Sequence, residues 1–318
     1  MNTRSTVTVT AVGAALLVAL AAVPMLASSG AWPHPAPRVH VHTHGRAAGW
    51  RDPGAVFPLR ETDRREQSFR LPGGKGRLVV DDVAGNVEVR GVDGDTVHVV
   101  ATQIVRAASA EDVALARQEM PLQLTQRGNS VVAYVDAPFR DDDGGVNFRG
   151  DDDVPYRVVY DFVIEVPRGV DVDLRTVLDG DVQARDLDGA FEVRNVNGEV
   201  TLAGMASAGT ASTVNGELHV AFRRNPAGAC DFGNVNGNVD VSFAPGLAAD
   251  VRYHTLNGEA WSDFPFTLVP TRPLVSERSD KGRYRVKSDW QEGIRIGAGG
   301  PLLSFDTVNG NIYLRQRG

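Results

Sequence analysis

The sequence is poor in cysteine and has no marked excess of positive charge. Its 318 residues include one cysteine, Cys230, which excludes an intrachain disulfide framework. Because Cys230 falls in an apolar, strand-like run, we expect a buried, unreactive thiol. The 33 basic and 40 acidic side chains give a net charge of −7. Such a mildly acidic chain is not expected to bind nucleic acid or an anionic membrane as its main partner.

Recognisable catalytic motifs are also missing. The sequence has no Gly-x-Ser-x-Gly elbow, P-loop, dinucleotide fingerprint or His-Glu-x-x-His pair, so we expect neither catalytic residues nor a cofactor. The carboxylates Glu199, Glu217 and Glu259 each follow a repeated glycine. A carbohydrate-active enzyme, a polysaccharide lyase or glycosidase, would need such a pair. The same residue recurring at the same repeat position favours a structural column, and hence a non-enzymatic protein.

Long apolar runs are confined to the start of the chain. Arg4 precedes an apolar core from Ala11 to Val23, about 13 residues, which is shorter than the ~20 that a spanning helix needs. Residues 1–29 therefore predict a cleaved signal peptide. We expect an exported protein that is periplasmic, at the cell surface or secreted, with no integral membrane domain after cleavage.

Residues 30–67 lack hydrophobic periodicity and are rich in proline, alanine, arginine and histidine, which predicts a flexible linker. Within it, His40, His42 and His44 alternate and are candidate ligands for Zn, Cu or Ni. Residues 141–153 carry six aspartates, a conceivable Ca²⁺ site. The simpler interpretations are a polar histidine-rich tail and a solvated acidic loop, and we favour both.

What the sequence does contain is a repeated Asn-Gly corner. The repeat glycines are 18 residues apart (180 to 198 and 198 to 216), then 21 (216 to 237 and 237 to 258), and Gly310 follows later. The corner residues are Asn197, Gly198, Asn215, Gly216, Asn236, Gly237, Asn257, Gly258, Asn309 and Gly310. Regular periods near twenty residues are typical of solenoids.

Apolar residues keep fixed positions relative to each glycine. They recur five and two residues before it and two and four residues after it, with mostly polar residues between the last two. This alternation predicts a strand on each side of the corner. A β-meander with Asn-Gly hairpins is the alternative, but the corner marks only every second strand. Stacked coils would also let Asn197, Asn215, Asn236 and Asn257 form an amide ladder.

The repeated Asn-Gly corner resembles the repeats of a known bacterial family. Ser212–Leu218 and Asp306–Ile312 are similar to the T-V-N-G-[DE]-[IV] repeats of a family of unknown function known as putative adhesins. The similarity extends from Phe69 to the C-terminus. It implies a β-solenoid and an exported location, and it brings no catalytic residues.

The expected fold is all-β: a single-stranded parallel β-helix or β-solenoid with coils of about 18–21 residues, over residues 68–318. One short helix is expected, capped by Ser109 and limited by Pro121.

One long excursion breaks the period between Pro265 and Gly300. A hairpin is expected around residues 280–282. Because long insertions in repeat proteins often carry function, we expect a binding site there. The candidate residues are Arg283, Tyr284, Arg285, Lys287 and Trp290. Basic and aromatic side chains suit a glycan, a cell-wall polymer or another envelope protein.

Overall fold

The structure is a computed structural model that describes residues 57–140, 145–146, 154–269, 277–278, 284–285 and 292–318. The chain divides into two units, Met1–Ala48 with Phe139–Arg149, and Gly49–Pro138 with Gly150–Gly318. In the first unit, the described residues Arg140 and Val146 form an isolated antiparallel β-bridge. The second unit is described below.

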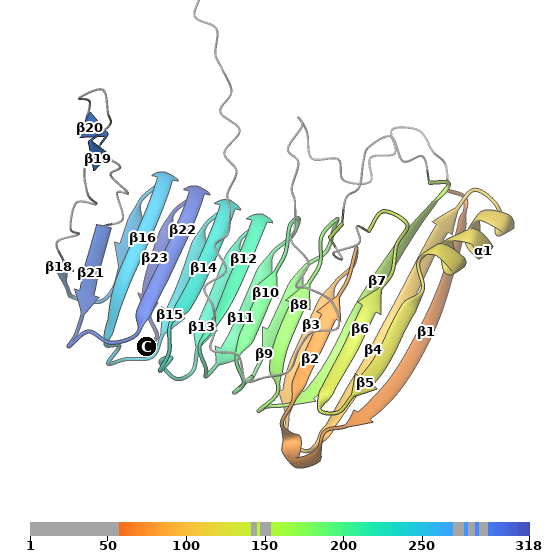
Figure 1. Ribbon diagram of the computed structural model, residues 1–318, viewed down its shortest axis with the longest axis horizontal. Helices are drawn as coiled ribbons and strands as arrows, with labels where there is room; N and C mark the ends of the chain where they lie inside the picture. Colours follow the sequence, from red (N-terminus) through yellow and green to blue (C-terminus); the bar gives the residue numbers. More distant parts are fainter. Residues whose placement is uncertain (1–56, 141–144, 147–153, 270–276, 279–283, 286–291) are drawn as a thin grey trace, which may run out of the picture. The chain divides into compact units, whose positions relative to one another are not determined.

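The second unit contains two large β-sheets (Figure 1). The ten-stranded sheet has, in spatial order, β1 (Leu59–Arg70), β4 (Thr96–Ala107), β7 (Tyr156–Pro167), β3 (Val87–Val92), β9 (Val182–Arg185), β11 (Val200–Met205), β13 (Leu218–Phe222), β15 (Val239–Phe243), β23 (Ile312–Gln316) and β17 (Ala260–Ser262). The eleven-stranded sheet has β18 (Phe266–Val269), β21 (Glu292–Ile296), β16 (Ala249–Asn257), β22 (Leu302–Asn309), β14 (Cys230–Asn236), β12 (Gly209–Asn215), β10 (Phe191–Arg194), β8 (Asp171–Arg175), β2 (Arg77–Asp81), β6 (Ser130–Val135) and β5 (Leu122–Arg127).

The predicted all-β class is confirmed, but both sheets are mixed, so the expectation of a wholly parallel coil is not met. Strands from β7 to β17 in the ten-stranded sheet, and from β6 to β16 in the eleven-stranded sheet, pair in parallel. At the ends β1, β4, β5, β18 and β21 pair antiparallel. These end strands lie outside the regular Asn-Gly repeat, so the repeat carried no information about their direction.

From β7 to β18 the chain alternates between the two sheets, and the inner faces of the sheets form the core. Phe222 of the ten-stranded sheet lies 6.3 Å, between ring centroids, from Phe232 of the eleven-stranded sheet. Val193, Val220 and Val241 are buried at the inward positions that the repeat predicted. Burial of such apolar surface is the main stabilising contribution to folding.

The short helix and the hairpin lie where the sequence predicted them. Helix α1 (Ala110–Glu119) begins after Ser109, whose Oγ accepts a hydrogen bond of 3.1 Å from the backbone N–H of Asp112. Val113 and Ala116 are its buried residues. The two strands β19 (Glu277–Arg278) and β20 (Tyr284–Arg285) pair antiparallel around the predicted hairpin. A 3₁₀ turn, η1 (Pro72–Gly74), follows β1, which itself begins within the segment expected as linker.

We call the two strands on either side of a corner a coil. The coils are not stacked in the order in which they follow one another in the sequence. The C-terminal coil, β22 and β23, lies between the coil of β14 and β15 and the coil of β16 and β17. The stacked corners therefore run Gly180, Gly198, Gly216, Gly237, Gly310 and then Gly258. Because the Asn-Gly corners are alike, any of them can stack on any other. The sequence therefore could not reveal this insertion.

Candidate binding surface

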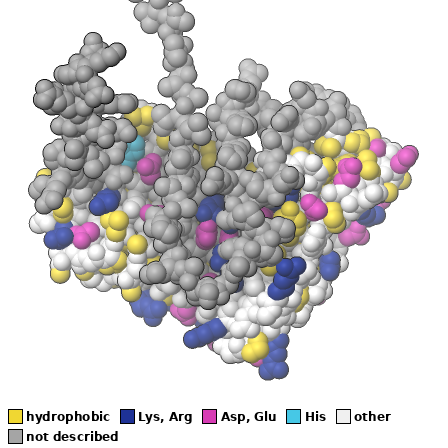
Figure 2. Space-filling model, viewed as in Figure 1, with side chains coloured by type: hydrophobic (Ala, Val, Ile, Leu, Met, Phe, Trp, Pro, Cys, Tyr) yellow, Lys and Arg dark blue, Asp and Glu magenta, His cyan; other side chains and the backbone are white. Residues whose placement is uncertain are grey.

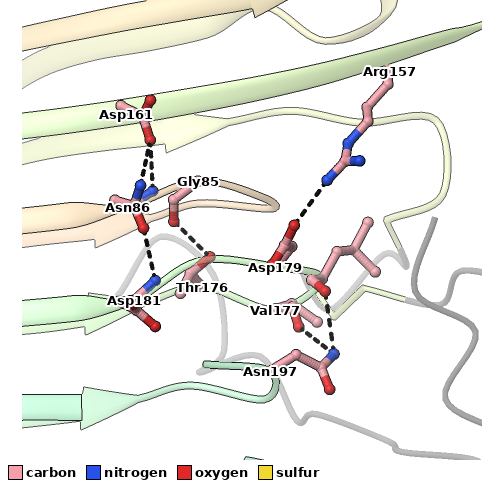
Figure 3. A network of polar contacts seen from close by, with 10 residues as sticks. Gly85, Asn86, Arg157, Asp161, Thr176, Val177, Asp179, Asp181 and Asn197 are labelled. Carbon is pink, nitrogen blue, oxygen red and sulfur yellow. Dashed lines mark hydrogen bonds and ion pairs between the residues drawn. The ribbon is translucent and has the colours of Figure 1, made fainter. Parts of the chain in front are cut away.

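The corners stack because three sets of polar groups connect each coil to the next. In the first set, each corner asparagine donates from Nδ2 to the Oδ1 of the preceding one. The distances are 2.9 Å for Asn215 to Asn197, 2.8 Å for Asn236 to Asn215, 2.8 Å for Asn309 to Asn236 and 2.8 Å for Asn257 to Asn309. Asn197 donates to the carbonyls of Val177 and Leu178 (Figure 3). The side-chain amides thus form a continuous ladder.

The second set joins the residue after most of the corner glycines to a backbone N–H of the next coil. Asp181 Oδ1 accepts from the N–H of Glu199 at 2.8 Å, and Glu217 Oε2 accepts from that of Asn238 at 3.1 Å. Figure 3 shows the first members, where Asp161 accepts from Asn86 and Asn86 accepts from the N–H of Asp181. Glu217 is therefore a coil-to-coil acceptor, and the Glu199 side chain bonds to the Thr201 hydroxyl.

The third set was not predicted. The residue three before each glycine is polar and faces inward, where it donates to the carbonyl of the preceding corner glycine. Asn195, Thr213 and Asn234 do so at 2.8, 2.9 and 2.8 Å. The apolar residue two before the glycine, expected to be buried, is buried at Leu178 but faces outward in the later copies. Val196, Val214 and Val235 are half-buried there and Leu256 is exposed.

Exposed apolar side chains gather at the coil of β16 and β17, which is the last in the stack, and on the strand β18 that follows. Six large hydrophobic residues are exposed in the described part of the chain, and four of them lie between residues 256 and 268. Their exposed fractions are 61% for Leu256, 56% for Trp261, 50% for Phe266 and 74% for Leu268. Figure 2 shows hydrophobic and basic side chains interspersed at the end where β16, β21 and β18 lie. A concentration of this kind indicates an interaction surface.

The last corner also opens into a hollow of about 690 Å³. It is lined by Tyr253, His254, Thr255, Leu256, Gly258, Glu259, Ala260 and Trp261. His254 Nδ1 lies 3.6 Å from a carboxylate oxygen of Asp306 on the neighbouring strand. At the other corners the next coil packs against the equivalent residues, so the hollow marks where the stack ends.

Two aromatic side chains lie side by side on the outer face of the ten-stranded sheet. Trp261 of β17 is opposite Tyr313 of β23, and both alternate with inward-facing neighbours. The Arg315 guanidinium lies 4.9 Å from the centre of the Tyr313 ring, and Arg315 Nε donates to Asp240 at 2.6 Å. We call Trp261, Tyr313 and Arg315 the aromatic surface. It offers flat apolar ring faces beside charged and polar groups.

A charged cluster on the outer face of the eleven-stranded sheet is a less convincing site. Asp173 is fully buried and accepts from Arg77 at 2.9 Å and from Arg175 at 3.1 Å. Arg175 is itself buried, and Glu192 lies 3.8 Å from Arg77. A buried carboxylate paired with two guanidinium groups is a satisfied structural contact.

Most of the predicted site residues fall outside the residues that the structure describes. His40, His42, His44, Arg283, Lys287 and Trp290 lie outside the described residues, as does most of the acidic segment 141–153. Tyr284 and Arg285 form β20, but the positions of their side chains are not described. In the described ranges, no three His, Cys, Asp or Glu side chains are placed to hold a metal ion. The metal hypothesis for the three histidines stays a prediction.

Cys230 is buried on β14, as expected, and burial raises the pKa of its thiol to about 11. The thiolate is the reactive form, so this cysteine is chemically inert near neutral pH. Over the residues that the structure describes, no helix is long and apolar enough to cross a membrane.

The chain matches no protein-family model and no curated protein. Solved structures similar to it include a putative cell adhesion protein from Clostridium sporogenes, with a TM-score of 0.41 and 9% identity over 81% of this chain and 100% of that one. A putative adhesin from Bacteroides fragilis has a TM-score of 0.36 and 10% identity over 80% and 97%. A putative lipid binding protein from Parabacteroides distasonis has 0.25 and 8% over 80% and 97%. Similarity this low does not contribute to the functional argument.

Proposed function

We propose that this protein is an exported, non-enzymatic module of the cell envelope that binds a glycan through the aromatic surface. The observation that supports this most is the pair formed by the exposed Trp261 and the half-buried Tyr313 at the end of the stack. Sugar rings present faces of C–H groups that pack on flat aromatic rings, while their hydroxyls need polar partners. Tyrosine and tryptophan supply such a face together with a polar group.

Charged groups beside the rings favour an acidic or strongly hydroxylated glycan. Arg315 lies over Tyr313, and Asp240 is its partner. The excursion residues Arg283, Tyr284, Arg285, Lys287 and Trp290 add further basic and aromatic groups after β18. We therefore infer that the excursion contributes part of the contact, with a cell-wall polymer or an envelope protein as the other candidate partners.

We also infer that the parallel strands form a short β-solenoid, exported through residues 1–29 and fitting the adhesin-like class that its repeats resemble. The stacked corners support the solenoid, and the apolar run Ala11–Val23 supports the export signal. No integral membrane domain and no nucleic-acid partner are part of this proposal. An enzymatic role is less well supported, because Glu217 is occupied as an acceptor between coils and Glu199 bonds to Thr201.

The proposal predicts that Trp261→Ala weakens glycan binding about tenfold. Loss of one aromatic stacking contact costs roughly 1–1.5 kcal/mol, which corresponds to that factor. Because Trp261 is exposed, the melting temperature should stay close to that of the parent. Binding is measured by titration calorimetry with the ligand found in a screen of glycans and cell-wall polymers.

The matched control is Val163→Ala, which truncates a side chain of similar exposed fraction, 50%, on β7. This variant should bind like the parent. In a second arm, residues 272–288 are replaced by a Gly-Ser linker, which should reduce binding while melting is unchanged. Equal binding by the Trp261→Ala variant and the parent would show that the aromatic surface is not the glycan site.

A further inference from the structure

The two sheets end at different places at the last coil. In the described residues β17 is the final strand of the ten-stranded sheet, whereas the eleven-stranded sheet continues past β16 with β21 and β18. The Asp250 carboxylate on β16 accepts from Arg295 of β21 at 2.7 Å, and this hydrogen bond lowers the pKa of Asp250. The eleven-stranded sheet therefore projects two strands beyond the other, and we call β21 and β18 the step.

The inner face of the step continues the core and then becomes exposed. Ala249 and Val251 of β16 pair with Ile296 and Ile294 of β21, which pair in turn with Phe266 and Leu268 of β18. Opposite residues in an antiparallel pair share a face, so all six side chains lie on the core side. The first four are at most 5% exposed, whereas Phe266 is 50% exposed and Leu268 is 74% exposed.

The edges at this end also lack the charges that protect the opposite edge of the ten-stranded sheet. Edge strand β1 reads LRETDRREQSFR and is charged along its length. Edge strands β17 and β18 read AWS and FTLV, without a single charge. Natural proteins place charges on free edges to prevent pairing with another chain. Edges β17 and β18 are uncharged, whereas edge β1 at the opposite end is charged. This difference indicates that β17 and β18 pair with strands of another chain.

We propose that two copies of this chain associate through their steps as a two-fold dimer, with the axis parallel to the strands. Rotation by half a turn about this axis exchanges the two sheet layers. The step of each copy then continues the layer of the other copy's ten-stranded sheet, next to β17. Each step projects by two strands, so it occupies the place of the two strands that the other copy lacks. The interface is isologous, which is the usual form in homodimers.

Strand directions are compatible with this pairing. The chain passes from the eleven-stranded to the ten-stranded sheet at the Gly258 corner and turns back there, so we infer that β17 runs opposite to β16. Because β21 is antiparallel to β16 and β18 is antiparallel to β21, β18 also runs opposite to β17. An axis parallel to the strands preserves their directions, and β17 of one copy meets β18 of the other as an antiparallel pair.

The alternation of faces also limits the possible registers. Trp261 lies on the outer face with Thr267, whereas Ala260 and Ser262 share the inner face with Leu268 and Phe266. Placing Trp261 opposite Thr267 of the second copy, and Ala260 opposite Leu268, is the register that keeps all three residues of β17 opposite residues of β18. Phe266 and Leu268 of both copies become buried in one continuous core.

This inference does not depend on the glycan proposal. The aromatic surface lies on the outer face, which the dimer leaves accessible, so each dimer would present two such surfaces. Trp261→Ala should weaken glycan binding without changing the molecular mass in solution. Loss of the dimer and loss of binding can therefore be observed separately.

The molecular mass of the purified protein at micromolar concentration, measured by analytical ultracentrifugation, tests the proposal. The parent should have the mass of two copies. Leu268→Lys should give the mass of one copy with an unchanged melting temperature, because Leu268 is exposed in the single chain. Thr267→Lys, one residue away on the outer face, should remain a dimer. A monomeric parent, or equal behaviour of the two variants, would refute the proposed interface.

A cysteine experiment tests the register independently. Cys230 is buried, so an introduced surface cysteine is the one that reacts. An equal mixture of Trp261→Cys copies and Thr267→Cys copies should form disulfide-linked pairs upon mild oxidation. Replacing the second partner by Val163→Cys copies should give at least a tenfold lower yield. Equal yields from the two mixtures would contradict the register.

Discussion

Val220→Asp is expected to abolish folding of the second unit. Val220 lies on the inner face of β13, is 2% exposed and pairs with Leu202 and Val241 in the adjacent strands. An unpaired carboxylate there costs several kcal/mol, a large share of the roughly 5–15 kcal/mol by which a domain is stable. We expect circular dichroism to show no cooperative melting transition for this variant.

His219→Asp is the matched control, because it places the same charge one residue away on the outer face. Asp240 lies opposite position 219, so a modest cost of about 1 kcal/mol or less is expected from repulsion between like charges. The variant should still melt cooperatively. Comparable destabilisation by the two substitutions would mean that the assignment of inner and outer faces is wrong.

Gly198→Ala is expected to have the second largest effect. Gly198 has φ of +147°, and an added Cβ would lie 2.1 Å from the carbonyl oxygen of Gly180 in the preceding coil. The two nearest atoms belong to the Gly180 backbone, which cannot move away, and the side-chain amide of Asn195 follows at 2.9 Å. Strain at such a dihedral costs roughly 1–3 kcal/mol, and overpacking costs about as much again. The melting temperature should fall by more than ten degrees for a loss of roughly 3–5 kcal/mol.

Gly94→Ala separates the two contributions. Gly94 has φ of +126°, but an added Cβ would have no neighbour within 4 Å. It therefore reports the dihedral strain without the clash and should be the milder variant by a few kcal/mol in the free energy of unfolding. If chemical denaturation gives the same loss for both variants, the close approach of the corner glycines does not stabilise the stack.

The sequence predicted the repeat well because the repeat has a strict physical requirement. Only glycine fits where successive corners approach within contact distance, and the stacked Asn197 and Asn215 bond to each other through their side chains. The inward residues two and four after each glycine follow from strand alternation and are buried as predicted at Val200 and Leu202. Such constraints recur in every coil, so a single sequence reveals them.

Other features were not predictable because alternation does not continue through the corner. Val214 is apolar but faces outward, while Thr213 is polar, faces inward and binds a glycine carbonyl. The recurrence of Asn or Thr three residues before the glycine was the signal for this third set. The insertion of the coil of β22 and β23 left no signal at all, since its Asn309–Gly310 corner is compatible with several positions in the stack.

The sequence did not predict the aromatic surface, because Trp261, Tyr313 and Arg315 lie outside the excursion, and the role of the excursion in binding stays a prediction. The excursion was expected to carry the contact, and two strands of it, β18 and β21, form the step. Exposure of Trp261 and Leu256 could not be predicted, because the equivalent positions in earlier coils are shielded by a following coil. Their exposure is a consequence of where the stack ends, which depends on pairing between distant segments.

The stack of corners ends at Gly258 and leaves an open surface there. Amide hydrogen exchange at the corner glycines tests it directly. The N–H groups of Gly198, Gly216, Gly237 and Gly310 donate to the asparagine carbonyl of the next coil at 2.9, 3.2, 3.0 and 3.2 Å. These amides should exchange slowly, close to the rate of global unfolding, whereas the Gly258 amide should exchange orders of magnitude faster. Protection of Gly258 equal to that of the other four would contradict the open end on which the proposed functions depend.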